Sequence, residues 1–333
     1  MFTPAELSEI KNLLTPENKI VILTHYNPDG DAIGSSLGLK HYLAAKGISA
    51  EVVVPNDFPK FLKWMPEAKK NIIAEYKRKV AADLVFEADV IFCLDFNSPS
   101  RIGILGDWLT KANAKKILID HHQQPENFDF VYSDTIIPAT CQMIYHFIEA
   151  MGDESLVNKE VADCLYTGIM TDTGGFRFRS TSATTHRIVA NLIEKGADPA
   201  LITSNTWDTN TITRLQLLAL ILGRIEVVND TVAVLYLTRN ELKEYGFQKG
   251  DTEGFVNYGL SILGVKMAAF FMEDLYEDFI KISFRSKDAI DVNQFSRKYF
   301  NGGGHINAAG GKSQENLQET IETFKERVVE EGF

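Results

Sequence analysis

The sequence predicts an α/β fold, with a parallel five-stranded sheet flanked by helices and a smaller α+β domain after it. The first half of the chain alternates runs of β-forming residues with helical patterns, and its apolar runs, such as VIFCL at 90–94, are continuous. Continuous apolar runs are typical of strands that are buried on both faces, as in a parallel sheet covered by helices. A chain of 333 residues is also too long for one ordinary core, so we expect two domains.

The first domain begins with a helix signal. Thr3-Pro4-Ala5-Glu6 has the pattern of a capping box with proline at the first helical position, and it opens an amphipathic helix through Leu14. The five strands are expected at Ile20–Thr24, Glu51–Val54, Val90–Leu94, Lys116–Ile119 and Phe130–Tyr132. Further helices are expected at Ile33–Lys46, around Trp108–Ala114, and at Ala139–Met151, Asn158–Met170 and Ser182–Lys195.

The second half of the chain has a different pattern, with fewer strand–helix alternations. The segment Ala197–Thr213 is rich in Thr, Asn and Asp, and we expect it to be a partly helical connection between two domains. The first domain is expected at 1–190, the linker at 191–214 and the second domain at 215–333. In the second domain two helices flank a glycine-rich loop. Its helices are expected at Leu215–Val228, Ile290–Tyr299 and Leu317–Glu330, and its strands at Thr231–Leu237, Val265–Glu273 and Asp278–Arg285.

Charge and cysteine content limit the classes of function. The formal net charge is −11, and the basic run Lys69–Lys79 is interrupted, so it indicates a solvated helix face rather than a surface for long nucleic acid. A phosphate-containing substrate would therefore be small. Cys93, Cys141 and Cys164 are scattered and resemble core residues of a reducing compartment. Without a secretion signal or an apolar run of ~20 residues, we expect a cytoplasmic protein.

The stretch Leu23–Ser35 carries the strongest chemical signal. His25, Asp29 and Asp31 follow the first strand with the spacing H-x3-D-x-D, which is a metal-ligand spacing on a strand-to-helix loop. Asn27-Pro28 and Gly30 are expected to supply the turns that bring the three side chains together.

Three later segments also end in aspartate. Asp95 follows VIFCL, Asp120-His121-His122 follows KILI, and Asp172 follows the apolar segment CLYTGIMT. Side chains at the carboxyl ends of parallel strands meet at one edge of a sheet, so these residues are expected to share one cleft with the first motif. Taken singly, each aspartate is more often a helix cap or a turn residue than a ligand, but four such segments in one chain favour a metal site.

A cluster of five carboxylates needs cations, because so many neighbouring negative charges cannot all remain ionised without them. Mixed carboxylate and imidazole ligands suit two Mn²⁺ ions better than Ca²⁺, and the lack of cysteine ligands argues against structural zinc. Two ions bridged by a carboxylate at about 3.5–4 Å would activate a hydroxide for attack on phosphorus. Mg²⁺ and Co²⁺ remain alternatives to Mn²⁺.

In this order, the motifs resemble the four motifs of the DHH phosphoesterase superfamily. The run Gly302-Gly303-Gly304-His305 and the run 308–311 (AAGG) are similar to the signature of its DHH-associated C-terminal domain. The resemblance covers nearly the whole chain, and the two-domain build is similar to the bifunctional oligoribonuclease (nanoRNase) and pAp phosphatase group.

The resemblance implies a role for each residue. His25, Asp29 and Asp95 would bind one Mn²⁺, and Asp95 would bridge to a second ion. Asp120 would orient a ligand histidine, and His122 would face the scissile phosphate. The second Mn²⁺ would be bound by Asp31, Asp95, His121 and Asp172.

Substrate contacts are expected from the second domain. Gly302, Gly303 and Gly304 lie next to a candidate helix start, where successive backbone N–H groups can bind an anion, with His305 adding a hydrogen bond. Arg285 is the next candidate for a phosphate contact, although a surface salt bridge is an equal alternative. From the first domain, Arg177 is a weaker candidate, and Arg101 is expected to support the loop after Asp95.

The expected activity is Mn²⁺-dependent hydrolysis of short oligoribonucleotides to 5′-mononucleotides and of 3′-phosphoadenosine 5′-phosphate (pAp) to AMP. Alternatives within the superfamily are a cyclic-di-AMP or linear dinucleotide phosphodiesterase, a family II pyrophosphatase and a RecJ-like exonuclease. The alternative of another class is a non-catalytic nucleotide-binding regulatory module. A homodimer is also expected for an enzyme of this size.

Overall fold

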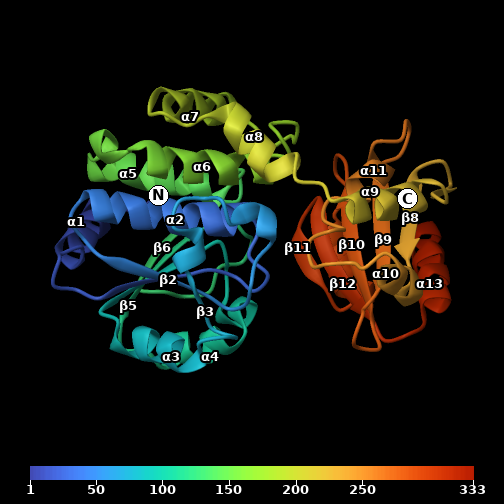
Figure 1. The fold of residues 1–333 in the computed structure, drawn as a ribbon, viewed down its shortest axis with the longest axis horizontal. Helices are drawn as coiled ribbons and strands as arrows, with labels where there is room; N and C mark the ends of the chain where they lie inside the picture. Colours follow the sequence, from blue (N-terminus) through green and yellow to red (C-terminus); the bar gives the residue numbers. More distant parts are fainter. The chain divides into compact units, whose positions relative to one another are not determined.

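The computed structural model describes residues 1–333, which divide into two compact units, Met1–Thr209 and Asn210–Phe333. Each unit contains one six-stranded sheet with helices on both faces (Figure 1). The α/β class and the smaller second sheet domain are therefore as predicted.

The first sheet is parallel throughout and has the strand order β3-β2-β1-β4-β5-β6. It has one strand more than predicted, because β3 has only two residues and is too short to give a sequence pattern. The order reverses between β1 and β4, and ligands of such sheets bind where the carboxyl ends of these two strands diverge. The strands are β1 (Ile20–Leu23), β2 (Ala50–Val54), β3 (Ile72–Ile73), β4 (Val90–Leu94), β5 (Lys115–Asp120) and β6 (Phe130–Ser133).

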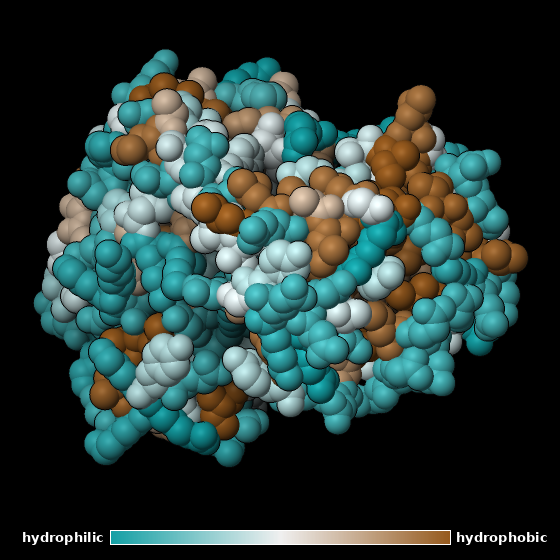
Figure 2. All heavy atoms as spheres, turned by 45° about the vertical axis from the view of Figure 1, so that its right-hand side comes forward, coloured by the Kyte–Doolittle hydropathy of each residue, from teal (hydrophilic) through white to brown (hydrophobic).

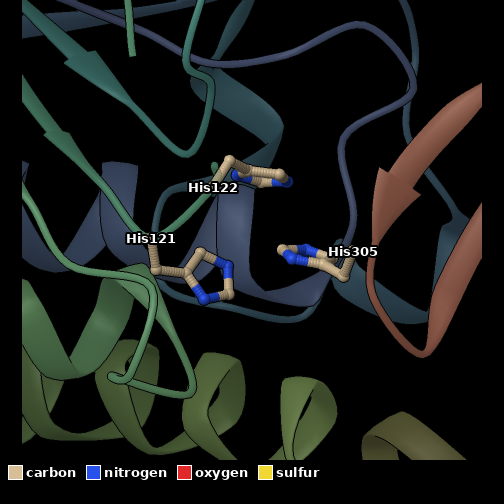
Figure 3. A group of neighbouring side chains, drawn as sticks. All are labelled: His121, His122 and His305. Atoms are coloured by element: carbon tan, nitrogen blue, oxygen red, sulfur yellow. The ribbon is translucent and has the colours of Figure 1, made fainter. Parts of the chain in front are cut away.

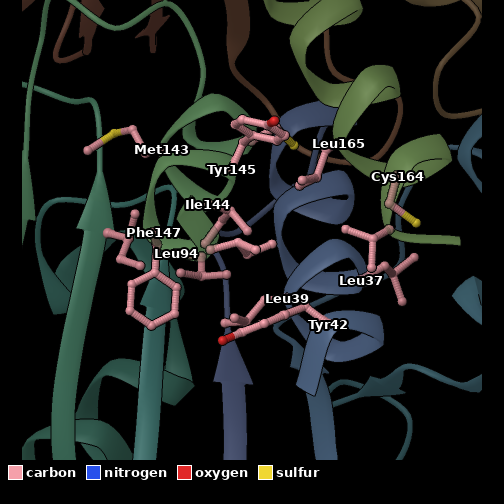
Figure 4. Close-up of a cluster of buried hydrophobic side chains, with 14 of the residues drawn as sticks. Leu37, Leu39, Tyr42, Leu94, Met143, Ile144, Tyr145, Phe147, Cys164 and Leu165 are labelled. Atoms are coloured by element: carbon pink, nitrogen blue, oxygen red, sulfur yellow. The ribbon is translucent and has the colours of Figure 1, made fainter. Parts of the chain in front are cut away.

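Both faces of this sheet are buried, which explains its continuous apolar runs. Ile20 and Ile22 face a large core with α1, α2, α5 and α6, part of which is drawn in Figure 4, whereas Val21 and Leu23 face a second core with α3 and α4. Helices α7 and α8 pack on α5 and α6 from outside (Figure 1). The helices are α1 (Pro4–Leu13), α2 (Gly30–Ala45), α3 (Arg78–Glu87), α4 (Ile104–Lys111), α5 (Thr140–Met151), α6 (Lys159–Asp172), α7 (Ala183–Glu194) and α8 (Pro199–Trp207).

A local signal places the start of α1. The predicted capping box is confirmed, since Thr3 Oγ1 accepts the N–H of Glu6 and the Glu6 carboxylate accepts the N–H of Thr3 at 2.7 Å. Helix α3 was not predicted, whereas α8 lies within the connecting stretch that was expected to be partly helical.

Glycines on α2 let this helix approach α6 closely. Gly30, Gly34 and Gly38 lie four residues apart and form one stripe of the helix. A β-carbon added to Gly34 would lie 2.6 Å from the carbonyl oxygen of Cys164, and one added to Gly30 would overlap the side chain of Thr171. The start of α2 therefore lies directly against the end of α6.

The second unit contains a mixed sheet of order β11-β12-β10-β9-β8-β7, in which only β8 and β9 are parallel. One face packs on α12 and α13 and the other on α9, α10 and α11. The strands are β7 (Glu226–Val228), β8 (Val232–Leu237), β9 (Met267–Glu273), β10 (Ile280–Ser286), β11 (Gly303–His305) and β12 (Ala308–Ser313). The helices are α9 (Ile212–Leu222), α10 (Arg239–Glu244), α11 (Val256–Leu260), α12 (Val292–Tyr299) and α13 (Leu317–Glu330).

Two predictions for this unit are wrong. The helix expected through Val228 ends at Leu222, because Gly223 caps it and β7 follows. The glycine-rich stretch is not an open loop beside a helix start but a hairpin, in which Gly304 pairs with Ala309. The small side chains allow the two strands to approach each other closely.

Hydrophilic side chains cover most of the surface in view in Figure 2, and hydrophobic atoms form separate patches. None of the helices combines the length and the apolar character that crossing a membrane would require.

We predict that Gly34→Ala destabilises the protein by roughly 1–3 kcal/mol, because the added methyl group overpacks the contact between α2 and α6. The free energy of unfolding from denaturant titration measures this. Gly223→Ala is the matched control, since that glycine has φ −68° and its added β-carbon would meet nothing closer than 3.5 Å. Equal stability of the two variants would contradict the prediction.

Candidate active site

The aspartates and histidines predicted for the site converge at the carboxyl edge of the first sheet. They come from the loops after β1, β4 and β5, from the end of β5, from the start of α2 and from the end of α6. Three groups of side chains each place their ligand atoms within 4.8 Å of one another. The groups are His25, Asp29 and Asp95; Asp31, Asp95 and His121; and Asp95, Asp120 and His122.

Asp95 belongs to all three groups. Its Oδ2 lies 3.5 Å from His25 Nε2 and its Oδ1 lies 3.4 Å from His121 Nε2. Thr140 Oγ1 donates to Oδ1 at 3.0 Å. The carboxylate is buried, and the backbone of Asp95 has φ +64°, a left-handed conformation that turns the side chain toward both histidines directly after β4.

The loop after β1 is held by its own hydrogen bonds. His25 Nδ1 lies 3.0 Å from the Tyr26 carbonyl oxygen, and Asn27, at φ +57°, exchanges hydrogen bonds with the side chain of Asn56. The turn expected at Gly30 is absent, because this residue is the first of α2 and its missing side chain serves the contact with α6.

Asp29 caps a helix and also faces the cluster, although the sequence pattern presents a helix cap and a metal ligand as alternatives. Its Oδ1 caps α2 by accepting the N–H groups of Asp31 and Ala32, both at 3.0 Å. Its Oδ2 lies 3.8 Å from His25 Nε2. The cap therefore fixes the second oxygen in the cluster.

Asp31 is held by the N-terminus of α5, which the sequence analysis did not connect with the site. The backbone N–H of Thr140 donates to Oδ2 at 2.5 Å and that of Cys141 donates to Oδ1 at 2.8 Å. A helix N-terminus stabilises a carboxylate. The helix itself was predicted, but its direction relative to Asp31 follows only from the tertiary fold.

The two adjacent histidines after β5 point in different directions. His121 Nδ1 lies 3.1 Å from the Ile137 carbonyl, and its Nε2 lies 3.4 Å from Asp172 Oδ2 and 3.8 Å from Asp31 Oδ2. His122 Nδ1 lies 2.7 Å from Asp120 Oδ1. Figure 3 shows the two rings pointing in different directions from adjacent residues; it also draws His305, which belongs to β11 of the second unit.

Burial and neighbouring charges shift the pKa values of the residues in the cluster. Burial, followed by the charge of Asp95, raises the pKa of Asp31 to about 7 and that of Asp120 to about 6. For His25, burial opposes the charged ring, but the nearby carboxylates of Asp29 and Asp95 outweigh burial and raise the pKa to about 10. The pKa of Asp172 is also raised well above its usual value, chiefly by burial.

The donor set fits divalent cations. The Nδ1 atoms of His25 and His121 each face a backbone carbonyl, so each carries its proton there and turns Nε2 toward carboxylate oxygens. The Nε2–oxygen distances of 3.4–3.8 Å exceed a hydrogen bond. Donor atoms bound to one ion at about 2.1 Å lie roughly 3.0–3.5 Å apart, so these distances leave room for an ion.

Arg101 lies closer to the chemistry than its predicted supporting role suggests. Its carbonyl accepts the N–H of Tyr26 at 2.8 Å, which ties the loop after β4 to the loop after β1. Burial, and then the charge of Arg101, lower the pKa of His122 well below its usual value. The sequence signal for this residue is only its position six residues after Asp95.

The remaining predicted residues are placed as follows. Arg177 is exposed and donates to the Gly174 carbonyl at 2.7 Å. Arg285 lies on β10 of the second unit, where its Nη1 donates to the Phe284 carbonyl at 2.9 Å.

The glycine run 302–304 enters the hairpin β11–β12. The N–H of Gly304 donates to the side chain of Asn293 at 3.0 Å, so this N–H serves the second unit's own structure. At φ +153° a β-carbon on Gly304 would overlap the backbone of β12, which explains the need for glycine here.

Two family models match the chain. The model for the DHH family, N-terminal domain, matches residues 19–169, and the model for the DHHA1 domain matches residues 229–330. The first match contains all of the cluster except Asp172.

Similar proteins match over nearly the full length. A Thermus thermophilus protein named bifunctional oligoribonuclease and PAP phosphatase NrnA is 32% identical, over 95% of this chain and 92% of its own. A Listeria monocytogenes cyclic-di-AMP phosphodiesterase, PdeA, is 28% identical over 90% of this chain but only 45% of its own. The crystal structure of an exopolyphosphatase-related protein from Bacteroides fragilis superposes with a TM-score of 0.94 at 39% identity, covering 98% of this chain and 96% of that one.

We predict that the affinity for Mn²⁺ rises as the pH increases from about 6 to about 9, with protons released on binding. In the metal-free cluster His25, with a pKa of about 10, and Asp31, with a pKa of about 7, hold protons that a cation must displace. Both residues lose their protons as the pH rises, so both make the affinity for Mn²⁺ increase with pH. Calorimetric titration in two buffers of different ionisation enthalpy measures the released protons, and a pH-independent affinity without proton release would contradict the prediction.

Proposed function

The chain belongs to the DHH phosphoesterase family, and we propose that it is a divalent-metal-dependent hydrolase of short oligoribonucleotides and pAp. The observation that carries this proposal is the position of Asp95. One of its carboxylate oxygens faces His25, and the other faces His121. One carboxylate shared in this way suits a pair of ions.

The ligand assignment follows from the three groups. We assign His25, Asp29 and Asp95 to one ion, and Asp31, Asp95, His121 and Asp172 to the other. Divalent cations bound there would neutralise charge on the phosphoryl oxygens and activate water. We favour Mn²⁺ because the ligands mix carboxylate and imidazole, with Mg²⁺ and Co²⁺ as alternatives.

The other residues orient the phosphate. His122 is oriented through its Nδ1 by Asp120, and we propose that its Nε2 contacts a phosphoryl or leaving oxygen of the substrate. Arg101 adds a positive charge beside this ring. Formation of 5′-mononucleotides breaks the bond between phosphorus and the 3′ oxygen, which leaves with a proton; removal of the 3′-phosphate from pAp breaks the same bond.

Similarity along both units supports the choice of substrate. The relative named oligoribonuclease and PAP phosphatase matches 95% of this chain, including the second unit. There we propose that Arg285, the glycine run 302–304 and His305 contact the terminal nucleotide, with Arg177 contributing from the first unit. The net charge of −11 is consistent with short rather than long nucleic acid.

Cyclic-di-AMP is the second candidate substrate, together with its linear product pApA. The match to PdeA over 90% of this chain supports it. A non-catalytic regulatory role receives no support, because every proposed ligand position holds a residue able to bind metal. We also propose a cytoplasmic location, which agrees with three free, buried cysteines.

We predict that the protein with Mn²⁺ releases mononucleotide rapidly from a diribonucleotide and a five-mer RNA and AMP from pAp, and acts slowly on a 24-mer. The assay includes cyclic-di-AMP and pyrophosphate. Asp95→Asn should lower every rate by at least about 10³-fold, because it removes the shared carboxylate. Turnover confined to pyrophosphate or cyclic-di-AMP would overturn the substrate assignment, and an active Asp95→Asn variant would overturn the shared-ligand assignment.

We predict that His122→Asn lowers kcat for pAp by roughly 10²–10⁴-fold, because this ring acts on the reacting phosphate. Mn²⁺ affinity should change little, since His122 is not assigned as a ligand. His121→Asn is the matched control, and it should weaken Mn²⁺ binding itself. A parallel loss of metal from both variants would show that His122 is a ligand instead.

A further inference from the structure

A pocket of about 300 Å³ in the first unit is not used by the chemistry described so far. It lies at the same carboxyl edge of the sheet as the metal cluster, over the strands β1, β2 and β3. Its walls come from the ends of these strands and from the starts of α3 and α4. We call it the Tyr26 pocket; it is lined by Tyr26, Pro55, Ala74, Glu75, Arg78 and Ile104.

The Tyr26 pocket is joined directly to the cluster through the backbone. Tyr26 follows His25, and its carbonyl lies 3.0 Å from His25 Nδ1. The N–H of Tyr26 donates to the Arg101 carbonyl at 2.8 Å. The pocket and the cluster therefore share one loop, in which a residue that lines the pocket directly follows a proposed metal ligand.

The walls suit a flat aromatic group. Tyr26 lines the pocket and is 46% exposed as a residue. Pro55 and Ala74 are buried and form an apolar base, and Ile104 adds an apolar wall. The polar groups of the lining come from Glu75, whose carboxylate lies 3.3 Å from the Tyr26 hydroxyl, and from Arg78. Such a combination of an aromatic face with few polar groups binds a nucleobase by stacking, with little dependence on its identity.

Arg78 brings a positive charge to the lining of the pocket, beside the negative charge of Glu75. Arg78 is the first residue of α3, and Lys77 is exposed directly before it. The first turn of this helix has no acidic residue, so the helix dipole adds to their positive charge. A phosphodiester next to a base in the pocket would be attracted to these charges.

We propose that the Tyr26 pocket binds the base of the second nucleoside of an oligoribonucleotide, the one joined through its 5′ oxygen to the scissile phosphate. The inference rests on the proposed function and extends it. Because pAp has only one nucleoside, it has no group to place in this pocket. The pocket is therefore a specificity site that separates oligoribonucleotide cleavage from pAp hydrolysis.

The test compares kcat/KM for the diribonucleotide pApA with kcat/KM for pAp, in the full chain with Mn²⁺. Tyr26→Ala should lower the ratio of the two values roughly ten-fold, because loss of a stacking partner weakens only the substrate that has a second base. Tyr26→Phe should keep the ratio, since the ring remains. Tyr76→Ala is the matched control, because Tyr76 is a 67% exposed tyrosine of the same unit that does not line the pocket.

The outcomes separate the two proposals. If Tyr26→Ala leaves the ratio of the two kcat/KM values unchanged, whether both values fall equally or neither falls, the pocket assignment is overturned. The proposed function would remain intact in that case. The same change in the Tyr76→Ala control would also overturn it. A wild-type protein that hydrolyses neither substrate would refute the proposed function, and this inference with it.

Discussion

Repulsion among buried carboxylates is the constraint on which the first unit depends. Asp31 and Asp95 are nearly inaccessible to solvent and lie within a few ångströms of the same histidine nitrogen. Removing two such charges from water is costly unless other groups compensate. Compensation here comes from the N–H groups of α5, from the Thr140 hydroxyl and from two imidazoles. These groups come from the start of α5 and from the loops after β1 and β5, so the sheet edge and this helix end must be in place together.

The close packing of α2 on α6 sets the distances between the carboxylates of the site. Asp31 is the second residue of α2, and Asp172 ends α6, so the spacing between these helices sets the spacing between the two carboxylates. The glycine stripe allows that spacing to be small. The same residues thus serve the core and the site, and a core mutation in this stripe acts on both.

The sequence predicted the composition of the site better than its geometry. Each aspartate that follows an apolar strand lies where a parallel sheet would bring it, because the carboxyl ends of such strands share one edge. The left-handed backbone at Asp95 and the contact of Asp31 with the start of α5 had no sequence signal, since both depend on segments distant in the chain. Gly30 was misassigned for the same reason: a glycine needed for a turn and one needed for helix packing look alike in sequence. The basic run Lys69–Lys79 was interpreted as solvated, and only the fold places one of its residues, Arg78, in the lining of a pocket.

The double role of Asp29 has a consequence for how the protein responds to metal loss. Its cap on α2, like the carbonyl contacts of His25 and His121, is formed by backbone groups of the chain alone. The donor atoms are therefore oriented before any ion arrives, and binding requires little further ordering of the chain. On the proposed metal assignment, a chelator removes activity without melting the helix, and returning the ion restores it. The site is then a preformed receptor, in contrast to small domains whose folding depends on their metal.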